Sequence, residues 1–160
     1  MTRMKKLAVA LCVAAALGAL LVPAATWAKD DVPLKATVVT TSYTAVPGTF
    51  PVLATITSYG EGTSTHLGKV TSSAVVTLTW TPTGIWSAGT ATTVAANGDR
   101  LCSTQSGWTT GPGAFVGTFT ITGGTGRFEG ATGSGIVTAS VDEDDVQTAT
   151  YVGTIDYKKK

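Results

Sequence analysis

The sequence has 160 residues, of which 43% are hydrophobic and only 13% are charged, and its formal net charge at pH 7 is +1. Three of its eleven basic residues precede residue 28, so the rest of the chain has eight basic against ten acidic side chains, a formal charge of −2. This balance offers no basic surface for nucleic acid, and we expect no nucleic-acid partner. Residues 29–160 suffice for one domain with a hydrophobic core and are too few for two.

Residues 1–28 have the three-part pattern of a secretory signal peptide. Basic residues at the start are followed by an uncharged run rich in Ala, Leu and Val from Leu7 to Pro23, and then by small residues that end at Ala28. This order of charge, apolar run and small residues is typical of a cleaved signal. We therefore predict cleavage after Ala28, export to the periplasm or the extracellular space, no membrane span in the mature chain, and a single domain over residues 29–160.

Cleavage would remove Cys12 and leave Cys102 as the one cysteine of the mature chain. A single cysteine cannot form an internal disulfide, even in an oxidising compartment, so the core must stabilise the domain. We interpret Cys102 as a buried small apolar group, because no histidine partner is evident near it. A nucleophile and a link between two chains are the alternatives.

From Val32 onward the sequence has no apolar residues at helical spacing and is dominated by Thr, Val, Gly and aromatic residues. Segments with the two-residue period of a strand are separated by turn residues such as Pro47-Gly48 and Pro82 to Gly84. In chain order, the predicted strands cover residues 34–44, 50–59, 72–81, 89–96, 100–104, 114–122, 135–141 and 146–157. An all-β fold of about seven to nine strands is a sandwich or a barrel, and closure into a barrel would hide the strand edges.

Two turns have specific signals in the sequence. Asn97-Gly98 predicts a tight β-hairpin, because such a turn needs positive φ at both central positions and Asn-Gly adopts it at low cost. Residues 142–145, all acidic, predict a solvated loop between the last two strands. Clustered carboxylates suggest calcium, but the spacing and the glycine of a calcium-binding loop are missing, so we expect no metal there.

The segment from Ile121 to Gly135, ITGGTGRFEGATGSG, is the most distinctive part of the sequence. It resembles the glycine-rich turn, GGTGRF followed by GAxG, of dirigent proteins and of bacterial secreted proteins of the allene oxide cyclase-like barrel group. THLGK at residues 65–69, NGD at 97–99 and VGTI at 152–155 are similar to features of the bacterial members. The resemblance implies a calycin-like, closed antiparallel barrel of about eight strands over most of the mature chain.

We interpret the glycine-rich segment as a structural turn between two late strands. Gly123, Gly124 and Gly126 allow backbone angles closed to other residues, and Phe128 can place its ring in the core. The glycines also suggest a phosphate-binding loop. However, no Lys-Ser/Thr follows them, and the next segment is a predicted strand rather than a helix, so we expect no phosphate site.

The chain has few residues suited to catalysis. His66, the one histidine, is a candidate for acid–base chemistry together with Asp99 and Glu129. The structural alternatives are a hydrogen-bonding role for His66 and an ion pair of Arg127 with Asp99 or Glu129. The resemblance implies acidic residues and a Tyr or Arg inside the barrel of the enzymes in the group, and no position here matches them by motif. We therefore expect no metal and no cofactor, and favour a protein that is not an enzyme.

Trp80, Trp86 and Trp108 lie in or beside predicted turns. An eight-stranded barrel has an interior just wide enough for packed side chains or for one small ligand. Together with His66, these tryptophans are the candidates for binding an apolar ligand near the mouth of the barrel. Filling a small core or covering a barrel end is the alternative role.

The sequence leaves three functions open. The first is an exported barrel that binds a small hydrophobic ligand. The second is an isomerase or cyclase acting on a hydrophobic substrate, which needs an open cavity with at least two buried polar side chains. The third is a self-associating envelope protein that forms a homo-oligomer.

Overall fold

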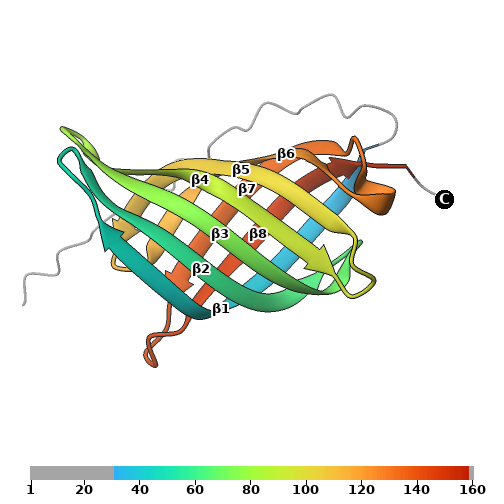
Figure 1. The fold of residues 1–160 in the computed structure, drawn as a ribbon, viewed down its shortest axis with the longest axis horizontal. Helices are drawn as coiled ribbons and strands as arrows, with labels where there is room; N and C mark the ends of the chain where they lie inside the picture. Colours follow the sequence, from blue (N-terminus) through green and yellow to red (C-terminus); the bar gives the residue numbers. More distant parts are fainter. Residues whose placement is uncertain (1–30, 159–160) are drawn as a thin grey trace, which may run out of the picture.

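The computed structural model describes residues 31–158, which fold into a closed antiparallel barrel of eight strands. Each strand pairs with the next one in the sequence, and β8 pairs with β1 to close the barrel (Figure 1). The strands are β1 (Val32–Pro47), β2 (Val52–Ser64), β3 (Gly68–Thr81), β4 (Gly84–Ala95), β5 (Arg100–Gly111), β6 (Ala114–Gly124), β7 (Thr132–Val141) and β8 (Gln147–Asp156). The predicted all-β closed barrel is confirmed, whereas the predicted signal peptide lies outside the described residues. No helix within residues 31–158 is long and apolar enough to cross a membrane.

Every predicted strand is present, and most are longer than predicted. The sequence predicts a strand over residues 100–104, for example, and β5 continues to Gly111. Within the added part of β5, Gly107 lies opposite Gly117 of β6, and both face the barrel interior. A Cβ atom on either glycine would collide with the backbone of the other strand, so glycine here marks close approach rather than a turn.

The hairpin predicted at Asn97-Gly98 joins β4 and β5, but its turn differs from the prediction. Among the described residues other than glycine, Asp145 alone has positive φ, so Asn97 does not adopt it. The Gly98 amide donates to the Ala95 carbonyl at 2.9 Å, and Gly98 has a φ of 88°. The side chain of Asn97 is bonded to Asp99. The turn is therefore a wider hairpin with glycine in the left-handed position.

Hydrophobic packing closes one end of the barrel, which we call the closed end. The β2–β3, β4–β5 and β6–β7 connections meet there, on the right in Figure 1. Gly123 and Gly124 end β6, and the short 3-10 helix η1 (Gly126–Phe128) follows. Phe128 is 0% exposed, which confirms its predicted place in the core. The buried cluster consists of Leu34, Leu67, Val70, Ala95, Leu101, Phe119, Ile121, Phe128, Ala131, Val137 and Ile155.

The interior differs toward the opposite end, which we call the open end, where the other four turns lie. The register of the strands places small side chains on the inner wall here. They include Ala54, Ser58, Ala74, Gly89, Gly117, Ala139 and Ala149. All of them are only half-buried, although they line the inside of a closed barrel. The barrel is therefore packed with large apolar side chains at one end and lined by smaller, less buried ones toward the other.

Replacing Phe128 by Ala should destabilise the barrel by about 3–5 kcal/mol, because it removes a buried ring and leaves a cavity at the closed end. Chemical denaturation followed by Trp fluorescence measures the change in unfolding free energy. Phe50→Ala is the matched control, since Phe50 is 71% exposed. The control should cost less than about 1 kcal/mol. Equal losses in the two variants would contradict the role of Phe128 in closing the barrel.

Candidate functional site

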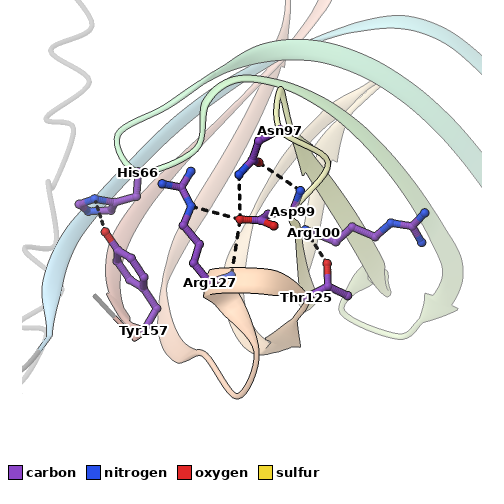
Figure 2. Close-up of polar contacts among 7 residues, drawn as sticks. All are labelled: His66, Asn97, Asp99, Arg100, Thr125, Arg127 and Tyr157. Carbon is purple, nitrogen blue, oxygen red and sulfur yellow. Dashed lines mark hydrogen bonds and ion pairs between the residues drawn. The ribbon is translucent and has the colours of Figure 1, made fainter. Parts of the chain in front are cut away.

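Charged and polar candidates gather at the closed end around Asp99 (Figure 2). The Asn97 side-chain amide donates to Asp99 Oδ2 at 2.9 Å, and the Asp99 backbone amide donates to Asn97 Oδ1 at 3.1 Å. Arg127 approaches the same carboxylate oxygen with its Nε at 3.5 Å and its backbone N–H at 3.5 Å. The Arg127 guanidinium also lies over the Phe128 ring, 4.9 Å from its centroid. The predicted pairing of Arg127 is thus made with Asp99, and it links the β4–β5 turn to η1.

The glycine-rich motif brings η1 against this carboxylate. Gly126 has a φ of 61°, and a methyl group on its Cα would collide with the side chain of Asp99. Thr125 adds a second link, because its Oγ1 accepts a hydrogen bond from the Arg100 amide at 3.0 Å. These contacts hold Phe128 over the end of the barrel. The motif therefore forms the β6–β7 connection and packs η1 against the β4–β5 turn.

His66 makes two contacts at the closed end. Its Nε2 lies 2.8 Å from the Pro33 carbonyl oxygen, and its Nδ1 lies 3.3 Å from the Tyr157 hydroxyl (Figure 2). Because a carbonyl oxygen only accepts, Nε2 carries the proton of the neutral ring and Nδ1 accepts from Tyr157. Tyr157 packs in turn on Phe128, with ring centroids 5.2 Å apart. His66 therefore connects the β2–β3 turn to β1 and to the residue that follows β8.

The structure does not bring His66, Asp99 and Glu129 together around an open interior. His66 and Asp99 are half-buried in different contacts of the closed end, and Glu129 is exposed on the β6–β7 connection. The partners described above for His66 and Asp99 are backbone groups and the side chains of neighbouring turns. A catalytic role for the three residues stays a prediction, and the contacts that they make serve the fold.

The three tryptophans lie in two different places. Trp80 lies beside Phe50 near the open end, with ring centroids 5.5 Å apart, and is 46% exposed. Trp86 and Trp108 are paired across β4 and β5 and meet edge to face, with centroids 4.9 Å apart. Ser87, next to Trp86, is 1% exposed and faces the interior, so this tryptophan pair faces outward. All three lie toward the open end, beside the β3–β4 and β5–β6 turns, and Trp80 is the one at an inward-facing position of the register, opposite Ile85.

The interior contains a polar pair that the sequence analysis missed. Tyr151 of β8 and Gln105 of β5 face inward, and the Tyr151 hydroxyl donates to Gln105 Oε1 across the barrel at 3.2 Å. The Tyr151 ring also contacts Phe119 edge to face, with centroids 5.5 Å apart. Gln105 Nε2 makes no hydrogen bond to another residue of the described chain. Since Phe119 belongs to the closed-end core, the pair marks the level at which the buried cluster gives way to the smaller, half-buried side chains of the open end.

Tyr151 lies deep in the barrel and is still reached by solvent. Burial raises its pKa from 10.0 to about 12. Its side chain is nevertheless half-buried, unlike that of Phe119, which is 3% exposed. A hydroxyl surrounded mostly by protein, on a side chain that is partly exposed, accounts for both observations. Tyr151 is therefore part of the inner wall of the barrel, and it is neutral at physiological pH.

The other polar groups on the inner wall are hydroxyls and side-chain amides. Ser87 and Thr109 meet there with their hydroxyl oxygens 2.6 Å apart, and Thr40 donates to Gln147 Oε1 at 3.1 Å nearer the open end. No Asp, Glu, His, Lys or Arg within β1 to β8 occupies an inward-facing position of the register. The interior can therefore exchange neutral hydrogen bonds, but its strands supply no group that titrates near neutral pH.

Two other sequence features lie on the surface. Residues 142–145 form the exposed β7–β8 turn, in which Asp142 Oδ1 accepts from the amides of Asp144 at 3.0 Å and Val146 at 2.9 Å. Cys102 is half-buried rather than buried as predicted, because the register places it on the outer face of β5. Within residues 31–158 no three or more potential metal ligands are grouped together.

Tyr151 should make the stability of the barrel depend on pH above pH 10. Its pKa is about 12 in the folded protein against 10.0 for a free tyrosine, so the unfolded chain loses this proton first. The stabilisation is complete below pH 10.0 and is lost as the pH rises toward about 12. Denaturation curves in this range should show wild type losing about 1–3 kcal/mol more than Tyr151→Phe does. A parallel decline in the two proteins would contradict burial of this hydroxyl.

Comparison with known proteins relates the barrel to one group of solved structures. No protein-family model and no curated protein matches the sequence. The structure of the pterocarpan synthase dirigent protein PsPTS1 superposes with a TM-score of 0.58 at 16% sequence identity, covering 84% of this chain and 99% of that chain. The pterocarpan synthase dirigent protein GePTS1 gives a TM-score of 0.55 at 14% identity, covering 84% of this chain and 90% of that chain. The chain is therefore a small β-barrel with the fold of dirigent proteins, as its glycine-rich motif implies.

Proposed function

We propose that the protein binds a small, uncharged and largely apolar molecule inside the open end of its barrel. The observation that carries this proposal is the inner wall, whose small side chains lie inside a closed barrel and are still only half-buried. The solved neighbours are named as pterocarpan synthases, which supports a barrel fold that accommodates small organic molecules. The signal-peptide pattern of residues 1–28 supports a site of action outside the cytoplasm.

The inner wall defines the chemistry of the ligand. Ile56, Val76 and Leu78 add apolar, half-buried surface to the small residues of the open end. At the inner end of this space, the Tyr151 hydroxyl donates its hydrogen to Gln105 Oε1. The Tyr151 oxygen can therefore still accept a hydrogen bond from a ligand, and Gln105 Nε2 can donate one. Burying an ion without a partner of opposite charge is costly, and the strands offer none inside. The ligand is therefore neutral, with one polar group directed at this pair.

Catalysis by an isomerase or cyclase mechanism has less support. Such a reaction needs a group that exchanges a proton near neutral pH. Tyr151, with a pKa of about 12, holds its proton too tightly for that role. The candidates from the sequence, His66, Asp99 and Glu129, are placed at the closed end. Binding without chemistry is the function that fits the interior best.

Titration of the purified protein with N-phenyl-1-naphthylamine, an uncharged dye that fluoresces in apolar surroundings, tests the proposal. Ala74 is half-buried on the inner wall of β3, opposite Ser58 and Ala91. Ala74→Phe should fill the space and weaken dye binding at least tenfold, or about 1.4 kcal/mol. Ala88→Phe is the matched control, because Ala88 is exposed on the outer face of β4. The control should bind the dye as wild type does.

Two results would reject an interior binding site: no dye binding by wild type, or unchanged affinity in Ala74→Phe. Far-UV circular dichroism should show that both variants keep the barrel. If Ala74→Phe does not fold, Ala149→Phe supplies the same block from β8, where Ala149 is half-buried on the inner wall. A fall in affinity with the inner variant and none with Ala88→Phe is the expected pattern.

A further inference from the structure

β1 extends past the strand that closes the barrel. Its pairing with β8 ends at Val39, opposite Thr148, whereas its pairing with β2 continues to Pro47. A register shift between Thr40 and Ser42 marks the point at which it leaves β8. Figure 1 shows the end of β1 beside β2 and apart from the tip of the β7–β8 hairpin. From Ser42 to Pro47, one side of β1 therefore has no strand partner among the described residues.

This edge is exposed and carries apolar side chains. Every residue from Thr41 to Pro51 is exposed. Tyr43, Val46 and Phe50 are 69%, 60% and 71% exposed, respectively. An open strand edge also presents backbone N–H and C=O groups that pair readily with another strand. The edge thus combines hydrogen-bonding capacity with apolar surface.

The edge lacks the charges that usually prevent strands from pairing. The sequence from Ala36 to Gly60 contains no Asp, Glu, Lys, Arg or His. Exposed edges are commonly protected by lysine, by proline within the strand or by a covering segment. Here Pro47 stands at the last position of β1 and leaves the residues before it unprotected. Two copies of this edge can therefore meet without repulsion between like charges.

We propose that residues 42–47 of β1 pair with the same residues of a second copy of the protein, antiparallel about a two-fold axis. An antiparallel ladder is unchanged when its two strands exchange places, so this edge is its own complement. Because this edge carries no charge, it does not favour a partner strand of opposite charge. A second copy offers a strand that is equally neutral and apolar. Thr44 and Val46 lie on the outer face and Tyr43 on the inner face, so the ladder gains side-chain contacts on both faces.

Sedimentation velocity of the purified protein, with reductant present to prevent a Cys102 disulfide, tests this dimer. Wild type should pass from monomer to dimer as its concentration rises. Thr44→Lys and Val46→Lys bring like charges together across the two-fold axis, and each should weaken dimerisation at least tenfold, or about 1.4 kcal/mol. Thr118→Lys is the matched control, because Thr118 is exposed on the outer face of β6 and far from any strand edge. The control should dimerise as wild type does.

Three outcomes would overturn the proposal. Wild type that stays monomeric at every concentration has no such dimer, and a dimer retained by both lysine variants lies elsewhere on the barrel. Monomeric wild type that still binds a synthetic peptide of residues 41–47 would show that the edge pairs with a free strand but not with a second folded copy. Because Thr44 and Val46 are both exposed, either variant should fold, and thermal unfolding checks that the barrel is intact.

Discussion

The packing of Phe128 over one end of the barrel is the contact on which the rest of the molecule depends. Polar side chains surround this ring: Asp99 and Arg127 hold η1 in place, while His66 reaches Phe128 through Tyr157. Only 13% of the residues in the chain are charged, so few such groups are left for other sites. The side chains that look most suited to catalysis in the sequence are found in the contacts that close the barrel.

Closure at one end leaves the interior to uncharged groups. Tyr151 reaches across the barrel to Gln105 at the level of Phe119, and beyond this level the wall is built mainly from Ala, Gly, Ser and aliphatic residues. Larger side chains would be needed to fill a barrel of eight strands. Leaving space in a protein interior sacrifices van der Waals contacts, so small residues along one half of the wall need a reason. A bound molecule that restores those contacts provides one.

The strands and the closed end could be predicted from the sequence, because a two-residue period, turn residues and a glycine-rich motif are local signals. Which residues line the interior could not be predicted in this way. Trp86 faces outward while its neighbour Ser87 is 1% exposed and faces inward, the reverse of what hydrophobicity suggests. Likewise Val152 is 47% exposed, and Tyr151 beside it points into the barrel. When both faces of a strand carry Thr, Ser, Val and Ala, alternation reveals two faces without showing which is inside.

Closing a barrel removes its exposed strand edges only where neighbouring strands extend equally far. β1 has 16 residues and β8 has 10, so the last part of β1 stands alone at the open end. Tyr43, in this part, is paired with Ser58, which lies on the inner wall. A strand added beside Tyr43 would therefore extend the wall that surrounds the proposed ligand. Ligand binding and pairing of two copies would share one apolar surface, and by linkage each would then change the affinity of the other.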